Sequence, residues 1–97
     1  MKWVFKKEAR DKFRETYQWY DEKSSKAGDN FIDEFNALIG EICQNPERWP
    51  PFYSERFRKA TMRRFPYQVI YRISEKQITV MIIRHEKRRR SYGLERL

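Results

Sequence analysis

Aromatic and small apolar residues recur every three to four positions near the start of the chain, at Phe5, Ala9, Phe13, Tyr17 and Tyr20. This spacing predicts one face of an amphipathic helix. The charged residues between them predict the opposite, solvated face. The stretch 24–28 is expected to end this helix, with Gly28 at a left-handed C-terminal position. Residues 1–5 are either a short strand or the lead-in to the helix.

A second apolar stripe follows at Phe31, Ile32, Phe35, Leu38, Ile39 and Ile42. It predicts a second helix, capped by Asp29 or Asn30, whose side chains accept hydrogen bonds from the first helical N–H groups. The helix should end at Asn45, because the residue before a proline avoids the helical region. Two helices joined by so short a turn form an antiparallel hairpin.

Residues 46–54 contain three prolines, which we take to exclude a regular element. Their aromatic residues are expected to pin this connector to the body of the protein, through Trp49, Phe52 and Tyr53.

Three strands are predicted after the connector, over residues 56–62, 65–73 and 77–84. In the first, Ala60 and Met62 share one side with two arginines, and Phe57, Lys59 and Thr61 share the other. In the second, one face carries Phe65, Tyr67, Val69, Tyr71 and Ile73, which are more typical of core than of base stacking. Strict alternation in the third puts Met81 and Ile83 on one face and the remaining aliphatics on the other, at Ile78, Val80 and Ile82. Apolar residues on both faces indicate a strand well inside the sheet.

Helices grouped before strands are the signature of the α+β class. We therefore expect one domain, 1–97, with a helical hairpin over about 5–45 and a mostly antiparallel sheet of three to four strands over about 56–84. A basic C-terminal tail, 85–97, follows the last strand.

The chain carries 22 lysines and arginines against 14 acidic residues, a formal charge of +8. Such a balance fits either a plain basic surface or a polyanionic partner, nucleic acid or an acidic protein. Cys43 is the only cysteine and lies in an apolar helical stripe, so we interpret it as a small buried hydrophobe. With neither a disulfide nor a secretory signal, a reducing cytoplasm is the expected compartment. No apolar run approaches the length of a membrane span.

Several segments, in the right order, resemble the RelE/ParE family of bacterial toxins, which includes plasmid-stabilisation proteins. Residues 63–71, RRFPYQVIY, resemble the family strand R-F-P-Y-x-V/I-x-Y, and residues 85–88, HEKR, resemble its later H-x-x-R. Trp19-Tyr20 resembles a W-Y pair late in the first family helix, and the pattern from Phe31 to Pro46 resembles the second helix. The resemblance implies a helical pair on a curved antiparallel sheet. It also implies a toxin restrained by a cognate antitoxin, which we expect to be an acidic protein because the toxin is basic.

Family members act in two ways. Those like RelE cut messenger RNA on the ribosome without a metal, and those like ParE poison DNA gyrase. RNA cleavage needs a proton acceptor, cations at the phosphate and a proton donor. The resemblance and the basic strand ends assign the catalytic role to Lys59, Arg63, His85, Arg88 and Tyr92. Nucleic-acid binding is assigned to Arg58, Arg64, Lys87, Arg89 and Arg90.

Two positions depart from the RelE pattern, since Thr61 and Gln68 replace basic residues. His85 has a second interpretation, in which it only holds the tail by hydrogen bonds, and Arg88–Arg90 can equally be a solvated charged run. No zinc motif or glycine-rich phosphate loop is present, so no metal or cofactor is expected. Our main hypothesis is a ribosome-dependent mRNA endonuclease toxin. The alternatives are a ParE-type gyrase inhibitor that acts by protein binding, and a binding module without toxicity.

Overall fold

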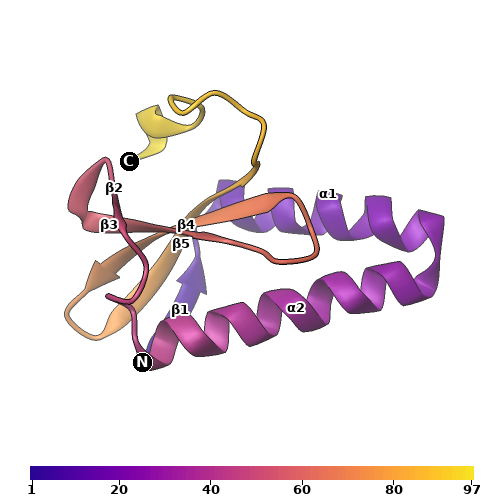
Figure 1. The fold of residues 1–97 in the computed structure, drawn as a ribbon, viewed down its shortest axis with the longest axis horizontal. Helices are drawn as coiled ribbons and strands as arrows, with labels where there is room; N and C mark the ends of the chain where they lie inside the picture. The colour runs from indigo at the N-terminus through magenta and orange to yellow at the C-terminus, as the bar shows by residue number, and fades with distance from the viewer.

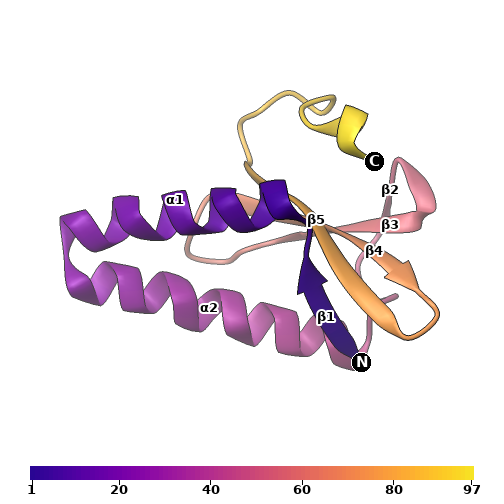
Figure 2. The same cartoon turned by 180° about the vertical axis from the view of Figure 1, so that it is seen from behind.

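The protein, described here over residues 1–97 by a computed structural model, consists of a helical hairpin, a sheet and a folded tail (Figure 1). The helices are α1 (Lys7–Lys23) and α2 (Ser25–Gln44), and the tail ends in a short 3-10 helix (Leu94–Arg96). The strands are β1 (Lys2–Phe5), β2 (Pro51–Phe52), β3 (Ser54–Thr61), β4 (Tyr67–Ser74) and β5 (Gln77–His85). The hairpin covers one face of the sheet and the tail crosses over the other side (Figure 2). The predicted α+β class is confirmed.

The sheet has the strand order β1-β5-β4-β3-β2, in which β1 runs parallel to β5 and all other neighbours are antiparallel. The N-terminal segment is therefore a strand, which settles the alternative left open by its sequence. The two-residue strand β2 shows that excluding any regular element from the connector was wrong. Pro51 is tolerated there because β2 is an edge strand, where a missing N–H costs no ladder hydrogen bond.

The two helices meet at a single residue, Ser24. Its own N–H closes α1 by donating to the Tyr20 carbonyl at 3.1 Å, and its hydroxyl Oγ accepts the N–H of Ala27 at 3.0 Å. Ser24 is thus the N-cap of α2. The prediction of a later cap at Asp29 or Asn30, after a left-handed Gly28, was wrong.

Gly28 lies buried in the first turn of α2, where the hairpin is tightest. A Cβ atom at this position would lie 3.0 Å from the Tyr17 ring and 3.1 Å from Asp21. Glycine is needed here for the close approach of two helices, and not for a left-handed backbone.

The main core lies between the hairpin and the sheet. The α2 stripe supplies Phe31, Phe35, Leu38, Ile39 and Ile42, and the sheet supplies Ala60, Met62, Val69, Tyr71, Ile78, Val80 and Ile83. The predicted α2 stripe is confirmed except for Ile32, which is half-buried. The same core holds one face each of β3 and β4, as the alternation of their residues predicted.

The pairing of β4 with β5 contains an irregularity that changes which residues of β5 share a face. Ile70 is opposite Ile82, but its neighbour Tyr71 is opposite Val80, so β5 carries one extra residue. Beyond this β-bulge, Ile83 faces the helices, whereas Met81 and Ile82 both face the other side. The strict alternation predicted for residues 77–84 was therefore wrong after position 81. Bulges shift the side-chain order in this way and often redirect residues near functional sites.

The connector is held by hydrogen bonds from two strands. Arg58 Nη1 on β3 donates to the Trp49 carbonyl at 2.9 Å, and the Tyr71 hydroxyl on β4 donates to the Pro46 carbonyl at 2.6 Å. Phe52 is 2% exposed and pins the connector as predicted. Tyr53 does not, because it is 64% exposed.

Burial raises the pKa of the Tyr71 hydroxyl to about 12, above the ordinary tyrosine value of about 10. Its contribution to folding is therefore fully present below pH 10 and is lost as the pH rises toward 12. We expect Tyr71→Phe to lower the free energy of unfolding by about 1 kcal/mol at neutral pH. This difference from wild type should shrink through the alkaline range. Urea unfolding at neutral pH and in the alkaline range measures the difference in stability between Tyr71→Phe and wild type. Tyr53→Phe, at an exposed tyrosine, is the control. If Tyr71→Phe and wild type differed in free energy of unfolding by as much in alkali as at neutral pH, this role of the Tyr71 hydroxyl would be refuted.

Candidate functional site

The face of the sheet opposite the hairpin, here called the open face, has a small core of its own. It consists of Phe52, Phe57, Ile70, Met81 and Ile82. The tail packs its last apolar residues, Leu94 and Leu97, against this core. Gly93 makes the approach possible, because it has a φ of 85° and a Cβ there would lie 3.0 Å from Ile82. The open face is therefore covered by the chain's own C-terminus.

Arg84, at the end of β5, holds the tail in place. The bulge directs this side chain to the open face, where it is only 2% exposed. Its Nη1 donates to the carbonyls of Arg90 at 2.7 Å and Tyr92 at 3.0 Å, and more weakly to that of Arg89 at 3.4 Å. Its Nε donates to Gln68 Oε1 at 3.0 Å. Gln68 thus acts as the acceptor that orients Arg84.

Three cations converge on the ring of Phe52. The distances to its centroid are 5.2 Å from Lys59 Nζ, 5.0 Å from Arg84 Cζ and 4.6 Å from Arg90 Cζ. None of the three takes part in an ion pair. Burial, and then the charges of Arg84 and Arg90, lower the pKa of Lys59. Burial, and then Arg90, lower the pKa of Arg84. The open face therefore has uncompensated positive charge beside an aromatic ring.

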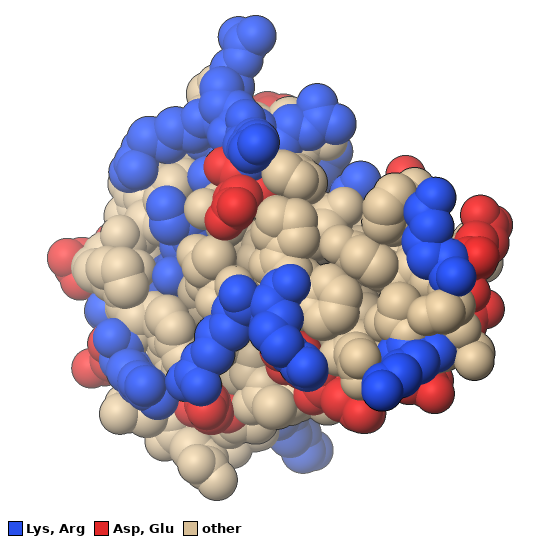
Figure 3. Space-filling model, turned by 45° about the vertical axis from the view of Figure 1, so that its right-hand side comes forward, with Lys and Arg blue, Asp and Glu red and all other residues tan.

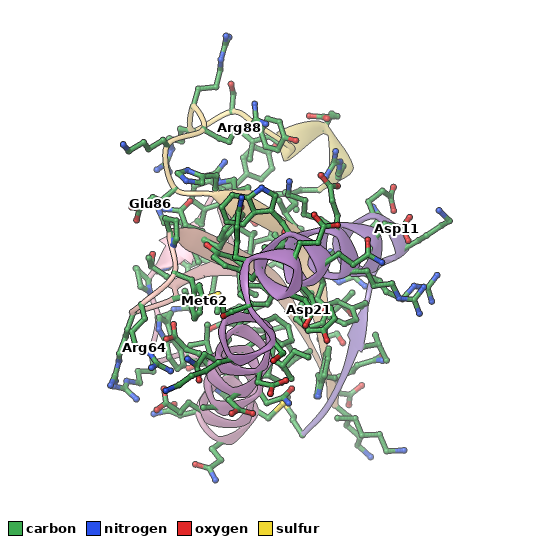
Figure 4. The ribbon with its side chains drawn as sticks, turned by 90° about the vertical axis from the view of Figure 1, so that its right-hand side faces the viewer. Asp11, Asp21, Met62, Arg64, Glu86 and Arg88 are labelled. Atoms are coloured by element: carbon green, nitrogen blue, oxygen red, sulfur yellow. The ribbon has the colours of Figure 1, made fainter.

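The tip of the tail continues this positive charge. Residues 87–90 are exposed, and the Arg88 guanidinium lies over the ring of Tyr92, 4.8 Å from its centroid. Figure 4 shows Arg88 on the tail at the top of the molecule, well away from Asp21 and Met62. Six of the ten predicted site residues thus gather on the open face and tail: Lys59, Lys87, Arg88, Arg89, Arg90 and Tyr92.

His85 lies on the other face of the sheet. Its ring packs edge-on against Tyr67 at 5.3 Å, in a shallow pocket that α1 lines with Lys12, Trp19 and other residues. Its Nδ1 accepts the N–H of Lys87 at 3.1 Å. This contact matches the interpretation in which His85 holds the start of the tail. The β-bulge explains this position, because strict alternation would have put His85 on the same face as Met81, the open face.

Three other predicted residues lie outside this cluster, and Arg63 is held there by its backbone alone. The carboxylate of Glu34 on α2 accepts the backbone N–H groups of Arg63 at 2.7 Å and Arg64 at 3.2 Å, and pairs with Arg64 Nε at 3.1 Å. Arg58 is held by the connector carbonyls and by Glu55 at 3.6 Å. Our proposed site therefore leaves Arg58, Arg63 and Arg64 out. It adds Arg84, whose one sequence signal is a charged residue ending an otherwise apolar strand.

The Glu34 contacts tie α2 to the turn between β3 and β4, and the Glu34 side chain is only 13% exposed. We expect Glu34→Gln to lower the free energy of unfolding by about 1 to 2 kcal/mol, because charge-assisted bonds to two N–H groups are weakened. Asp33→Asn, on the exposed side of the same helix turn, should change it by less than about 0.5 kcal/mol. Urea denaturation of both variants checks this. Equal effects of the two substitutions would show that the Glu34 contacts contribute nothing specific.

The structure contains no group of three histidine, cysteine, aspartate or glutamate side chains able to hold a metal ion. Neither helix has the length and apolar character needed to cross a membrane.

The fold matches a solved structure described as "Chromosomal ParDE TA system from P. aeruginosa". The likeness has a TM-score of 0.63 at 16% sequence identity and covers 88% of this chain and 95% of that chain. This likeness supports the RelE/ParE-like fold that the sequence predicted.

The match of the sequence to a family model identifies the class more narrowly than the likeness in fold does. Residues 4–92 match the family described as "ParE toxin of type II toxin-antitoxin system, parDE". The chain therefore belongs to the ParE toxin family, as the resemblance of its motifs to RelE/ParE toxins predicted. Membership in this family implies an antitoxin as partner. A search of the curated proteins with this sequence gives no match.

Proposed function

We propose that the protein is the toxin of a type II toxin–antitoxin pair and inhibits DNA gyrase by binding to it, without catalysing a reaction of its own. The family match supports the gyrase-directed alternative over our main hypothesis of an mRNA endonuclease. The observation that carries the proposal is the dispersal of the expected catalytic groups. His85 is on the helix face, while Lys59 and Arg88 are on the other side of the sheet.

The chemistry of RNA cleavage explains why this dispersal matters. A base, a phosphate-binding cation and an acid must all reach one phosphodiester within hydrogen-bonding distance. Here the guanidinium of Arg84 is committed to backbone carbonyls, and the Tyr92 ring lies beneath the guanidiniums of Arg88 and Arg96. The tail residues Leu94 and Leu97 cover the sheet on which a substrate would lie. A binding toxin needs none of these groups to be free.

One observation keeps the endonuclease as the second candidate. The lowered pKa of Lys59 shifts this amine toward the range in which a lysine works as a general base. Arg90 lies over the same phenyl ring as Lys59, where it would attract a phosphate. The proton donor for the leaving oxygen would have to be Tyr92 on the tail, whose ring lies beneath Arg88 and Arg96.

The antitoxin that restrains this toxin is expected to be acidic and partly disordered, and to fold on the basic open face and tail. We place the pair in the cytoplasm, where gyrase acts.

A reaction that contains neither ribosomes nor RNA separates the two candidates. Purified toxin is added to gyrase and relaxed plasmid, and supercoiling is followed on a gel. We expect inhibition and an accumulation of cleaved plasmid bound to gyrase. Topoisomerase I on the same plasmid is the control and should stay active. Normal supercoiling, together with cleavage of messenger RNA in a reconstituted translation reaction, would refute the proposal.

A further inference from the structure

The tip of the tail has four consecutive cations, Lys87, Arg88, Arg89 and Arg90, which are all exposed and form no ion pair. Two cations on α1 are different, because Lys7 pairs with Asp11 and Lys12 with Glu15. Figure 3 shows lysine and arginine side chains gathered at the top of the molecule, the height at which the tail lies in Figure 1. The tip is therefore a strongly positive surface without internal neutralisation.

The backbone of the tip is ordered before any partner arrives. The N–H of Arg88 donates to the His85 carbonyl at 3.0 Å, and the N–H of Tyr92 donates to the Arg89 carbonyl at 2.9 Å. Arg84 holds the carbonyls of Arg89 and Arg90 from beneath. A partner would then have only side chains to order, which lowers the entropic cost of binding.

The aromatic residues around the tip decide which polyanion fits it. Single-stranded nucleic acid is bound by stacking bases on free aromatic rings beside a basic groove. The Tyr92 ring lies under Arg88 and Arg96, and the Phe52 ring is buried beneath its three cations. The aromatic residues that are more than half exposed, Trp19 and Tyr53, belong to α1 and the connector. Duplex DNA needs only cations at the spacing of its phosphates.

From this arrangement we propose that residues 87–90 bind the phosphate backbone of duplex DNA. The inference rests on the proposed function, since the relevant duplex is the one that gyrase holds. The tail adds a sequence-independent contact to the DNA, while the rest of the toxin binds the enzyme. No base is read, because phosphate contacts fix position and carry no sequence information.

The test is fluorescence anisotropy of a short labelled duplex with the full-length toxin alone, over a series of salt concentrations. Four phosphate contacts predict that log K falls with log salt at a slope of about −3.6. The tail variant K87Q/R88Q/R89Q/R90Q should bind at least tenfold more weakly, with a slope closer to zero. The control R14Q/K23Q/K26Q/K76Q removes the same charge from α1, α2 and the β4–β5 turn, and should bind within about twofold of wild type.

Two results would overturn the inference. Equal losses in both variants would mean that net charge, and not the tail, attracts DNA. Tighter binding of single-stranded DNA or RNA of the same length would mean that the partner is not a duplex. Circular dichroism checks that each variant is folded, as expected because the substituted side chains are exposed.

The gyrase assay separates this inference from the function on which it rests. A toxin that inhibits gyrase without binding the duplex refutes the tail contact and leaves the function standing. A toxin that binds the duplex through its tail and leaves gyrase active refutes the function and leaves the tail contact standing.

Discussion

Replacing Arg84 by methionine is expected to lower the free energy of unfolding by about 3 kcal/mol and to release the tail. Methionine retains much of the volume of the arginine stem, so packing changes little. The carbonyls of Arg90 and Tyr92 and the Gln68 amide, however, lose their donor. Each buried acceptor left without a partner costs about 1 to 3 kcal/mol. The summed loss is smaller than three such costs, because the tail detaches and water then reaches the unpaired oxygens.

Urea unfolding and limited trypsin digestion measure the two effects. Trypsin cuts after lysine and arginine, so a released tail will be cleaved at residues 87–90 long before the rest of the chain. Arg72→Met on β4 is the matched control, because Arg72 is half-buried and forms no ion pair. It should change the stability by less than about 0.5 kcal/mol. An Arg84→Met protein with wild-type stability and a protected tail would show that something else holds the tail.

Phe35→Ala should destabilise the protein by about 4 kcal/mol. Phe35 is 1% exposed and is the centre of a cluster of four aromatic rings. Its ring centroid lies 5.9 Å from that of Trp3, 5.6 Å from that of Phe5 and 4.6 Å from that of Phe13. These rings come from β1, α1 and α2. Alanine therefore leaves a cavity at the point where the N-terminal strand joins the hairpin.

The loss is measured by urea or thermal unfolding, with Phe35→Leu as the control. Leucine fills most of the space and should cost about 1 to 1.5 kcal/mol. If the alanine variant lost no more than the leucine variant, the four rings would not be the centre of the core.

The spacing of apolar residues correctly predicted those parts of the fold in which the same spacing continues over several helical turns or strand residues. The α2 stripe around Phe31 and Phe35 and the alternation around Val69 and Tyr71 are of this kind. The β-bulge was not predictable, because residues 78–83 are all apolar except Thr79 and fit either face equally well. Ser24 was not predicted as a cap because a glycine such as Gly28 commonly ends a helix. Gly28 is instead required by a close contact with the other helix, which the sequence of one helix does not reveal.

In the candidate site, too, some residues could be predicted from the sequence and others depend on the folded arrangement. Residues 87–90 were expected to be functional from their charge and from their place after the last strand, and that surface is retained in the proposal. Arg84 and its acceptor Gln68 were not identified, since a hydrogen bond between neighbouring strands depends on register. His85 was grouped with Lys59 because position in the sequence does not reveal that a bulge separates them.

Induced expression in a bacterial host tests the central claim, a toxin that acts on gyrase by binding, most directly. RNA 5′ ends are mapped while covalent gyrase–DNA complexes are recovered from the same culture. Binding to gyrase predicts intact messages and a rise in trapped gyrase–DNA complexes as growth stops. Cleavage clustered within translated codons, abolished by Arg88→Ala and without trapped gyrase, would contradict it and identify the open face as the active site of a ribosomal nuclease.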